Sequence, residues 1–210
     1  MTESLEVPEQ VQIRMDKRAE LVERGMQAYP VSVPIDATIA ELRAQYGNLE
    51  AEASTGKIVG IAGRVIFSRN TGKLCFATLS AGSGETIQAM VSLAEVGEES
   101  LADWKSLVDL GDYVFVHGEV ITSKRGELSV MVDSWQMAAK ALRPLPVAHK
   151  DMGEESRVRQ RYVDLIMRPQ AQEMARLRVK AVAALRNSLA QRDYLEIETP
   201  MLQTQPGGAT

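Results

Sequence analysis

Residues 57–92 read KIVGIAGRVIFSRNTGKLCFATLSAGSGETIQAMVS, and this stretch decides the fold. Apolar residues alternate with other residues along most of it, and a period of two is typical of β-strands with one buried face. The stretch predicts three strands, at 59–67, 74–79 and 86–91, which glycine-containing turns separate. In the first strand, the residues expected to share one face are Val59, Ile61, Gly63, Val65 and Phe67.

The elements that follow have an order that indicates a small barrel. Residues 95–108 predict a helix, and residues 113–121 and 128–137 predict a fourth and a fifth strand. Three strands, a helix and two more strands make up the element order of a five-stranded OB-fold barrel. Small barrels of other kinds fit the same pattern.

Helices are predicted before these strands. Near the N-terminus, apolar residues recur every three or four positions, which predicts a helix with one buried stripe. That stripe consists of Val11, Met15, Ala19, Val22 and Met26. Thr38 and Glu41 have the spacing of a capping box, in which two side chains bond each other's backbone N–H groups, and they predict the start of a second helix.

The C-terminal part predicts one long helix and one strand. After Pro169, a helical apolar stripe is formed by Met174, Leu177, Ala181, Leu185 and Leu189. Residues 194–199 then alternate as a strand does. One helix and one strand cannot bury their apolar faces without further elements. We therefore expect a second domain that is truncated at residue 210.

The expected fold class is α+β, with a five-stranded antiparallel OB-fold barrel between N-terminal helices and the first helix and strand of the second domain. Four segments are expected. They are a helical extension at 1–56, the barrel at 57–141, a linker rich in proline and arginine at 142–170, and the truncated domain at 171–210.

Composition excludes several classes of protein. The chain has 210 residues, of which 45% are hydrophobic and 25% charged, as in ordinary globular proteins. No run approaches the roughly 18 apolar residues of a membrane-spanning helix, and the start, MTESLE, lacks the apolar region of a secretory signal. The single cysteine, Cys75, cannot form an internal disulfide and is expected in the core. We expect a cytoplasmic protein.

Charge is unevenly distributed along the chain. The net charge is −4, yet basic residues outnumber acidic ones between residues 140 and 192. This asymmetry is typical either of a contact with a polyanion or of a solvated helical surface.

The sequence predicts no self-contained catalytic residues and no metal site. His117 and His149 are isolated, so there is no histidine–cysteine ligand set. The fragments TGK at 55–57 and 71–73 lack the first glycine of a phosphate-binding loop.

Four polar or aromatic residues of the barrel have the side chains that recognition of single-stranded nucleic acid requires. They are Arg64, Phe76, Gln88 and Glu127. An aromatic ring stacks on a base, an amide donates and accepts at base edges, and a carboxylate accepts from amino or imino groups. The alternative interpretation is a core phenylalanine and three solvated polar residues.

Several motifs resemble those of class IIb aminoacyl-tRNA synthetases. In the barrel these are GR at 63–64, GKLCFATL around Phe76 and RGELS around Glu127. Outside it, KALRPLP at 140–146 and RVRQRYVDLI at 157–166 resemble the bacterial lysyl-tRNA synthetase family in particular.

Near the C-terminus, YLEIETPML at 194–202 resembles motif 1 of class II enzymes, and QPGGA at 205–209 is similar to the loop that follows it. The resemblance makes Pro200 the characteristic motif 1 proline. Asp193 and Tyr194 replace the usual Gly-Phe before the motif.

This resemblance implies a role for each candidate residue of the barrel. Phe76 would stack on the central anticodon uridine, Gln88 and Glu127 would read base edges, and Arg64 would contact bases or phosphate. In the C-terminal part, the resemblance implies a dimer interface and the edge of an amino-acid pocket. The interface residues would be Arg178, Leu185, Glu196 and Pro200, and the pocket residues Gly207 and Gly208.

The activity that the resemblance implies is ATP- and Mg²⁺-dependent attachment of lysine to tRNA through a lysyl-adenylate. The implied partners are a lysine tRNA and a second copy of the chain, without membrane or DNA. Because the ATP-binding motifs 2 and 3 follow motif 1 in the family, we expect a fragment that binds neither ATP nor Mg²⁺ alone. The alternatives are a non-catalytic tRNA-binding or dimerisation module and a fragment of an aspartyl- or asparaginyl-type synthetase.

Overall fold

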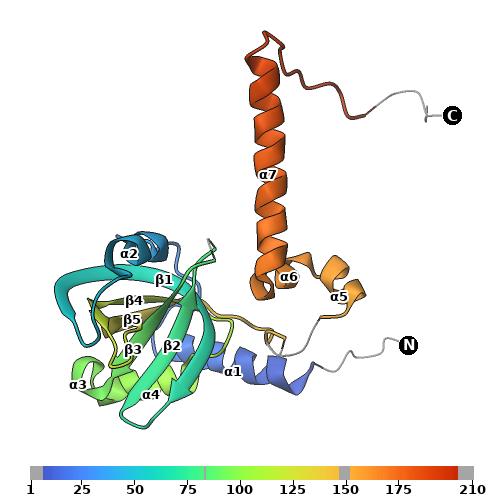
Figure 1. Cartoon of the computed structure of the whole chain (residues 1–210). Helices are drawn as coiled ribbons and strands as arrows, with labels where there is room; N and C mark the ends of the chain where they lie inside the picture. The colour runs from blue at the N-terminus through green and yellow to red at the C-terminus, as the bar shows by residue number, and fades with distance from the viewer. Residues whose placement is uncertain (1–6, 83, 147–151, 203–210) are drawn as a thin grey trace, which may run out of the picture. The chain divides into compact units, whose positions relative to one another are not determined.

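Five strands close into a barrel in the computed structural model (Figure 1). The structure describes residues 7–82, 84–146 and 152–202. The strands are β1 (Ser54–Asn70), β2 (Leu74–Ser80), β3 (Thr86–Ser92), β4 (Tyr113–Thr122) and β5 (Leu128–Ala139). Their spatial order is β1-β2-β3-β5-β4, and β1 pairs with both β2 and β4. The prediction of a five-stranded barrel in an α+β chain is confirmed.

One pair of strands departs from the predicted antiparallel arrangement. β3 and β5 run parallel, with Gln88 opposite Ser129 and Val91 opposite Val132, whereas the other four pairs are antiparallel. Parallel neighbours need a long connection between them. Here the chain passes from β3 through α3 (Leu93–Val96), α4 (Glu98–Leu107) and β4 before it enters β5.

The predicted helix at 95–108 is therefore two helices. Gly97 separates α3 from α4 and has a φ of +81°, a conformation that other residues rarely adopt. On α4, Trp104 is buried against Trp135 of β5, with the two rings edge-to-face and their centroids 5.2 Å apart.

Alternate residues of β2 and β3 fill the interior of the barrel. The inward-facing residues are Cys75, Ala77 and Leu79 on β2 and Ile87, Ala89 and Val91 on β3, all at most 2% exposed. This burial confirms the prediction that Cys75 belongs to the core, and it raises the pKa of the thiol. The outward-facing side chains of the same strands are free to form a binding surface.

The predicted capping box begins α2 (Ile39–Tyr46). The Thr38 hydroxyl accepts a hydrogen bond from the backbone N–H of Glu41 at 3.2 Å, and the Glu41 carboxylate accepts one from the backbone N–H of Thr38 at 2.8 Å. Hydrogen bonds from the Thr38 side chain and backbone lower the pKa of Glu41. Ile39 and Leu42 of this helix are buried in the core.

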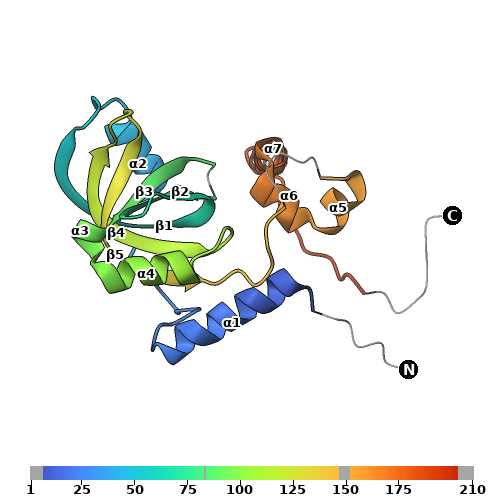
Figure 2. The same ribbon diagram turned by 90° about the horizontal axis from the view of Figure 1, so that it is seen from below.

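The apolar stripe predicted near the N-terminus is not the buried face of α1 (Glu9–Glu23). Met15 and Val22 are exposed, whereas Arg14 and Leu21 are buried. Arg14 donates to the backbone carbonyls of Leu110 and Ala141 at 2.9 and 3.1 Å. The prediction was wrong because polar contacts, which hydrophobic periodicity does not register, fix the rotation of this helix. Figure 2 shows α1 beside α4, where Arg24 pairs with Asp103.

A buried ion cluster joins the end of β5 to the loop before β4. The Lys140 ammonium is fully buried and lies 2.7 Å from Asp112 Oδ2, 2.6 Å from Asp109 Oδ2 and 2.7 Å from the Leu107 carbonyl. Asp112 also accepts the backbone N–H groups of Asp109 and Ala141. Burial acts to raise the pKa of Asp109, but hydrogen bonds from Lys140 and Lys17 outweigh it and lower the pKa.

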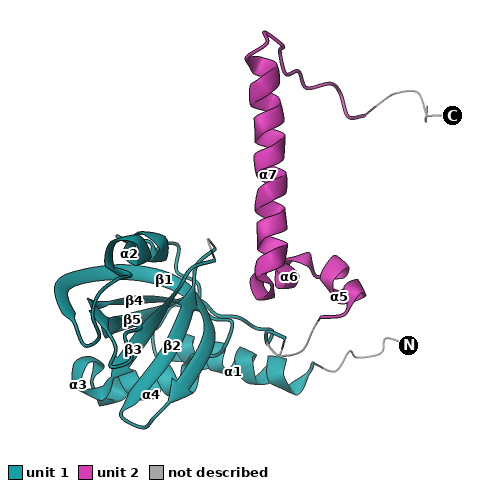
Figure 3. Cartoon of the chain, viewed as in Figure 1, with its two compact units in different colours: residues 1–147 teal, residues 148–210 magenta. Residues whose placement is uncertain are grey.

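Residues 1–147 and 148–210 form two separate compact units (Figure 3). The second unit contains α5 (Glu154–Arg159), α6 (Arg161–Met167) and α7 (Pro169–Ala190), so two short helices lie within the predicted linker.

The long C-terminal helix is confirmed as α7, whereas residues 194–199 form no strand. An extended segment becomes a strand only by pairing with another, and no described residue pairs with this one. The predicted boundaries at residues 56, 141 and 170 stay predictions.

No helix in the described ranges combines the length and apolar character that a membrane crossing requires.

Candidate nucleic-acid interface

A β-bulge decides which side chains of β1 reach the outer surface of the barrel. Val65 pairs with Leu79, but the next pair is Phe67 with Thr78, so Ile66 is an extra residue. One extra residue reverses the face that each later side chain occupies. Phe67 is therefore 55% exposed and lies on the outside, away from Val65. The prediction that these two residues share a face was wrong.

The strand register arranges the outer side chains in two adjacent rows. One row consists of Arg69, Phe76, Met90 and Met131, and the other of Phe67, Thr78, Gln88 and Ser129, of which Ser129 is fully buried. The two rows thus bring aromatic, sulfur-containing, polar and cationic groups together on β1, β2, β3 and β5. Neighbours in such rows are close enough for their side chains to act together.

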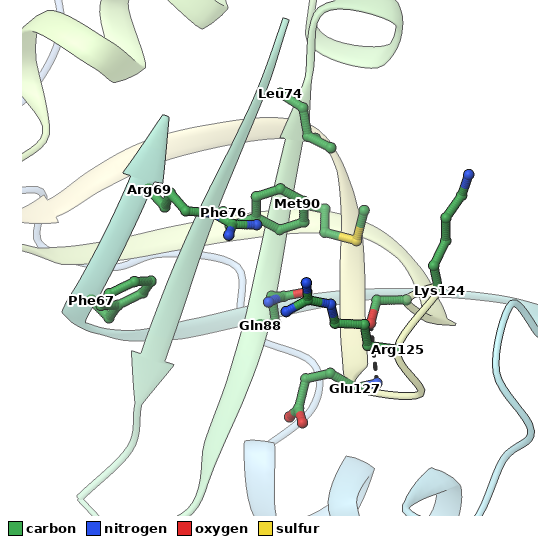
Figure 4. Close-up of a pocket in the computed structure, with 10 residues that line it drawn as sticks. Phe67, Arg69, Leu74, Phe76, Gln88, Met90, Lys124, Arg125 and Glu127 are labelled. Carbon is green, nitrogen blue, oxygen red and sulfur yellow. Dashed lines mark hydrogen bonds between the residues drawn. The ribbon is translucent and has the colours of Figure 1, made fainter. Parts of the chain in front are cut away.

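Residues of both rows and of the turn between β4 and β5 line a cavity of about 390 Å³ (Figure 4). Its lining consists of Phe67, Arg69, Leu74, Phe76, Gln88, Met90, Ser123, Lys124, Arg125 and Glu127. The volume falls within the range of small-molecule and cofactor sites. The structure thus brings together three of the four residues that the sequence singled out in the barrel, Phe76, Gln88 and Glu127.

The fourth of these residues, Arg64, lies away from the cavity. It precedes the bulge, and its guanidinium donates to the Gly111 carbonyl at 2.7 Å and lies over the Tyr113 ring, 5.8 Å from the ring centroid. Arg69, five residues later on the same strand, lines the cavity instead. The role of Arg64 as an anticodon contact stays a prediction.

Phe76 presents its ring beside a positive charge. The Arg69 guanidinium carbon lies 5.0 Å from the centroid of the ring, within the range of cation–π attraction. Phe76 is partly exposed, whereas Cys75 and Ala77 on either side of it are buried. The alternative of a core phenylalanine is therefore excluded, and a ring face suited to stacking lies at the surface.

Neighbouring polar groups orient Gln88 and Glu127. The Ser129 hydroxyl lies 3.1 Å from the amide oxygen of Gln88 and 2.9 Å from the backbone carbonyl of Glu127, so these two acceptors share its single proton. The carboxylate of Glu127 is half-exposed, and Oε1 is paired with Arg43 of α2. Arg43 is itself held by a 2.7 Å hydrogen bond from its Nε to the Thr86 carbonyl.

Sequence reasoning missed several residues of this cavity. Lys124 and Arg125 lie between the predicted fourth and fifth strands and were given no role, although two adjacent cations beside a nucleic-acid face are a readable signal. Phe67 was assigned to the wrong face. Arg43 gave no signal, because 84 residues separate it from Glu127.

The candidate dimer residues lie in the second unit and are exposed there. Leu185 belongs to the exposed apolar stripe of α7, together with Met174, Leu177 and Leu189. Glu196 accepts a 2.8 Å hydrogen bond from Arg186. Arg178 and Pro200 are exposed as well. Gly207 and Gly208 lie outside the described residues, and the roles of all six stay predictions.

No group of three or more histidine, cysteine, aspartate or glutamate side chains is arranged to hold a metal ion in the part of the chain that the structure describes.

Two family models match successive parts of the chain. Residues 59–138 match an OB-fold nucleic acid binding domain, and residues 153–210 match the class II tRNA synthetases (D, K and N). The first match coincides with the barrel that carries the cavity.

Curated relatives match nearly the whole chain. The lysine--tRNA ligase of Mycolicibacterium gilvum (strain PYR-GCK) is 61% identical over 97% of this chain. Those of Kineococcus radiotolerans and Synechococcus sp. (strain CC9311) are 58% and 44% identical over 98% and 93% of it. The chain spans only 40–41% of the length of these relatives. The chain is therefore a homologue of the lysine--tRNA ligases, and it contains an OB-fold nucleic acid binding domain and a segment of a class II tRNA synthetase domain.

Proposed function

We propose that the barrel binds the anticodon of a lysine tRNA and that the chain serves in a lysine--tRNA ligase. The observation that carries this proposal is the cavity that gathers Phe76, Gln88 and Glu127 on the outer face of an OB-fold barrel. Such barrels bind single strands by stacking bases on aromatic rings and by reading base edges with polar groups.

The three side chains complement the edge of a uracil stacked on Phe76. Uracil presents one imino N–H between two carbonyl oxygens. The Glu127 carboxylate, whose Oε1 is engaged by Arg43, can accept the imino proton at Oε2. The amide N–H groups of Gln88, whose amide oxygen lies 3.1 Å from the Ser129 hydroxyl, can donate to a uracil carbonyl. These groups would fix the identity of the base, while Phe76 supplies affinity.

Cations at the cavity supply the sequence-independent part of binding. Arg69 on β1 and Lys124 and Arg125 on the β4–β5 turn line the same cavity. Phosphate contacts of this kind add affinity by releasing counterions and fix the register of the strand. A positively charged rim beside a stacking surface fits a nucleic-acid strand better than an apolar peptide.

The wider activity belongs to the same proposal. A ligase of this kind uses ATP and Mg²⁺ to activate lysine, and we assign no step of that activation to the described residues, which hold no cluster suited to a metal. We also propose that the exposed apolar stripe of α7 contacts a second copy of the chain, with Arg178, Leu185, Glu196 and Pro200 in the interface. The proposed location is the cytoplasm.

Replacing Phe76 with alanine tests the proposal. We expect the F76A chain to bind a fluorescent lysine anticodon stem-loop about 1–3 kcal/mol more weakly, which is the usual contribution of stacking one base. I58A is the matched control, because Ile58 is an exposed apolar residue of the same barrel that does not line the cavity. Equal affinity of F76A and the parent chain would refute the proposed site.

A further inference from the structure

We infer that Phe67 is a second stacking residue, which takes the base next to the one on Phe76. The inference rests on the proposed function, because it needs a nucleic-acid strand in the cavity. It assigns the cavity at least two adjacent nucleotides and makes Phe67 a determinant of which loops bind.

The backbone aims Phe67 outward. The register shift at Ile66 places Phe67 opposite Thr78 on the outer face, whereas Val65, before the shift, is fully buried. Bulges commonly redirect a side chain at a functional site. A single exposed apolar residue needs no explanation. Phe67, however, lines the same cavity as Phe76 and three cationic residues.

The register sets the spacing of the two rings. Phe76 and Thr78 lie two residues apart on one face of β2, and Phe67 is paired with Thr78. Phe67 and Phe76 are therefore diagonal neighbours, for which the usual separation is about 7–8 Å. This separation is about twice the roughly 3.4 Å between bases that stack on each other. Two adjacent bases could therefore each use one ring only if they are splayed apart, which is how proteins commonly bind unstacked bases of single-stranded loops. Figure 4 shows the two rings on neighbouring strands of the same cavity.

Arg69 is placed to contact the phosphate between these bases. It follows Phe67 by two residues on the same outer face, and its guanidinium lies over the Phe76 ring. A cation that lies over one ring and lines the same cavity as the other suits a dinucleotide, since the linking phosphate connects its two nucleotides. This charge distinguishes a nucleic-acid occupant from an apolar one.

The test is a mutant cycle between Phe67 and the bases of the anticodon loop. Fluorescence anisotropy would measure the affinity of the 210-residue chain and its F67A, F67W and F67L variants for the lysine anticodon stem-loop. The same loop with a single abasic site at each position near the central uridine forms the other side of the cycle. F76A and I58A are the positive and negative controls, and thermal unfolding checks that each variant is folded.

We expect F67A and F67L to weaken binding about 5- to 150-fold, and F67W to keep the parent affinity. For the loop with an abasic site at one position next to the central base, F67A should cause no further loss of affinity, because the base that Phe67 would stack on is already missing. The inference is overturned if folded F67A binds like the parent chain while F76A does not. It is also overturned if F67A weakens binding equally for every abasic loop. If F76A binds like the parent chain as well, the proposed function itself fails.

Discussion

Removing the buried charge of Lys140 should destabilise the first unit more than any loss of a surface charge. In K140M, Asp112 keeps a carboxylate with 0% side-chain exposure but loses its cation, and the Leu107 carbonyl loses its donor. Breaking a buried ion pair on one side costs about 3–5 kcal/mol. That is a large part of the roughly 5–15 kcal/mol by which domains are stable. Asp109 keeps Lys17 as a partner, so the main loss is at Asp112.

Urea unfolding at pH 7 would measure this loss. The two tryptophans, Trp104 and Trp135, both lie in the first unit and report its unfolding by fluorescence. K57M is the matched control, because Lys57 is exposed and should change stability by less than about 0.5 kcal/mol. The double variant K140M/D112N should recover part of the loss, since it removes the unpaired charge. A cost below about 1 kcal/mol for K140M, or a double variant with the summed losses of both single variants, would refute the reasoning.

Three further outcomes are expected. Because the pKa of Asp109 is lower in the folded state than its unfolded value of 3.8, the ionised carboxylate stabilises the fold above that pH. This stability is lost as pH falls through the folded pKa. The acid unfolding curve of D109N should therefore depend less on pH below about pH 4 than that of the parent chain. T38A should destabilise the first unit by about 1 kcal/mol in urea, because it removes the cap of α2, and T38S should restore most of it. The logarithm of the binding constant for the anticodon loop should fall with the logarithm of the salt concentration, with a slope of roughly −2 for three phosphate-contacting cations. K124A and R125A should each reduce the magnitude of this slope by about 0.7. An unchanged slope in both variants would exclude Lys124 and Arg125 as phosphate contacts.

The period-two pattern and the turn residues were sufficient to predict a small five-stranded barrel, though not which kind, because its strands are half-buried and alternate regularly. Two of the four candidate residues in the barrel could be placed on the outer face for the same reason, because Phe76 and Gln88 lie at outward positions of strands with clear alternation. The capping box of α2 was also predictable, since both of its partners lie within four residues.

The remaining features depend on contacts between distant segments. The bulge at Ile66 leaves the local apolar pattern unchanged, so Phe67 was assigned to the core face. The buried face of α1 is set by Arg14 and by carbonyl groups 96 and 127 residues away in the sequence. Residues 194–199 have the alternation of a strand, but strand formation requires a partner that alternation alone does not provide.

The central claim is that the cavity reads a base of the lysine anticodon, and the affinity ratio for loops with uridine or cytidine at the central position tests it most directly. Uracil donates its imino proton to an acceptor, whereas the corresponding nitrogen of cytosine is itself an acceptor and faces the Glu127 carboxylate unfavourably. We predict that the parent chain prefers the uridine loop by about 5- to 150-fold, in line with about 1–3 kcal/mol for discrimination by a well-placed pair of hydrogen bonds. E127Q, which can donate as well as accept, should lose most of this preference. Equal affinity of the parent chain for both loops would contradict the account.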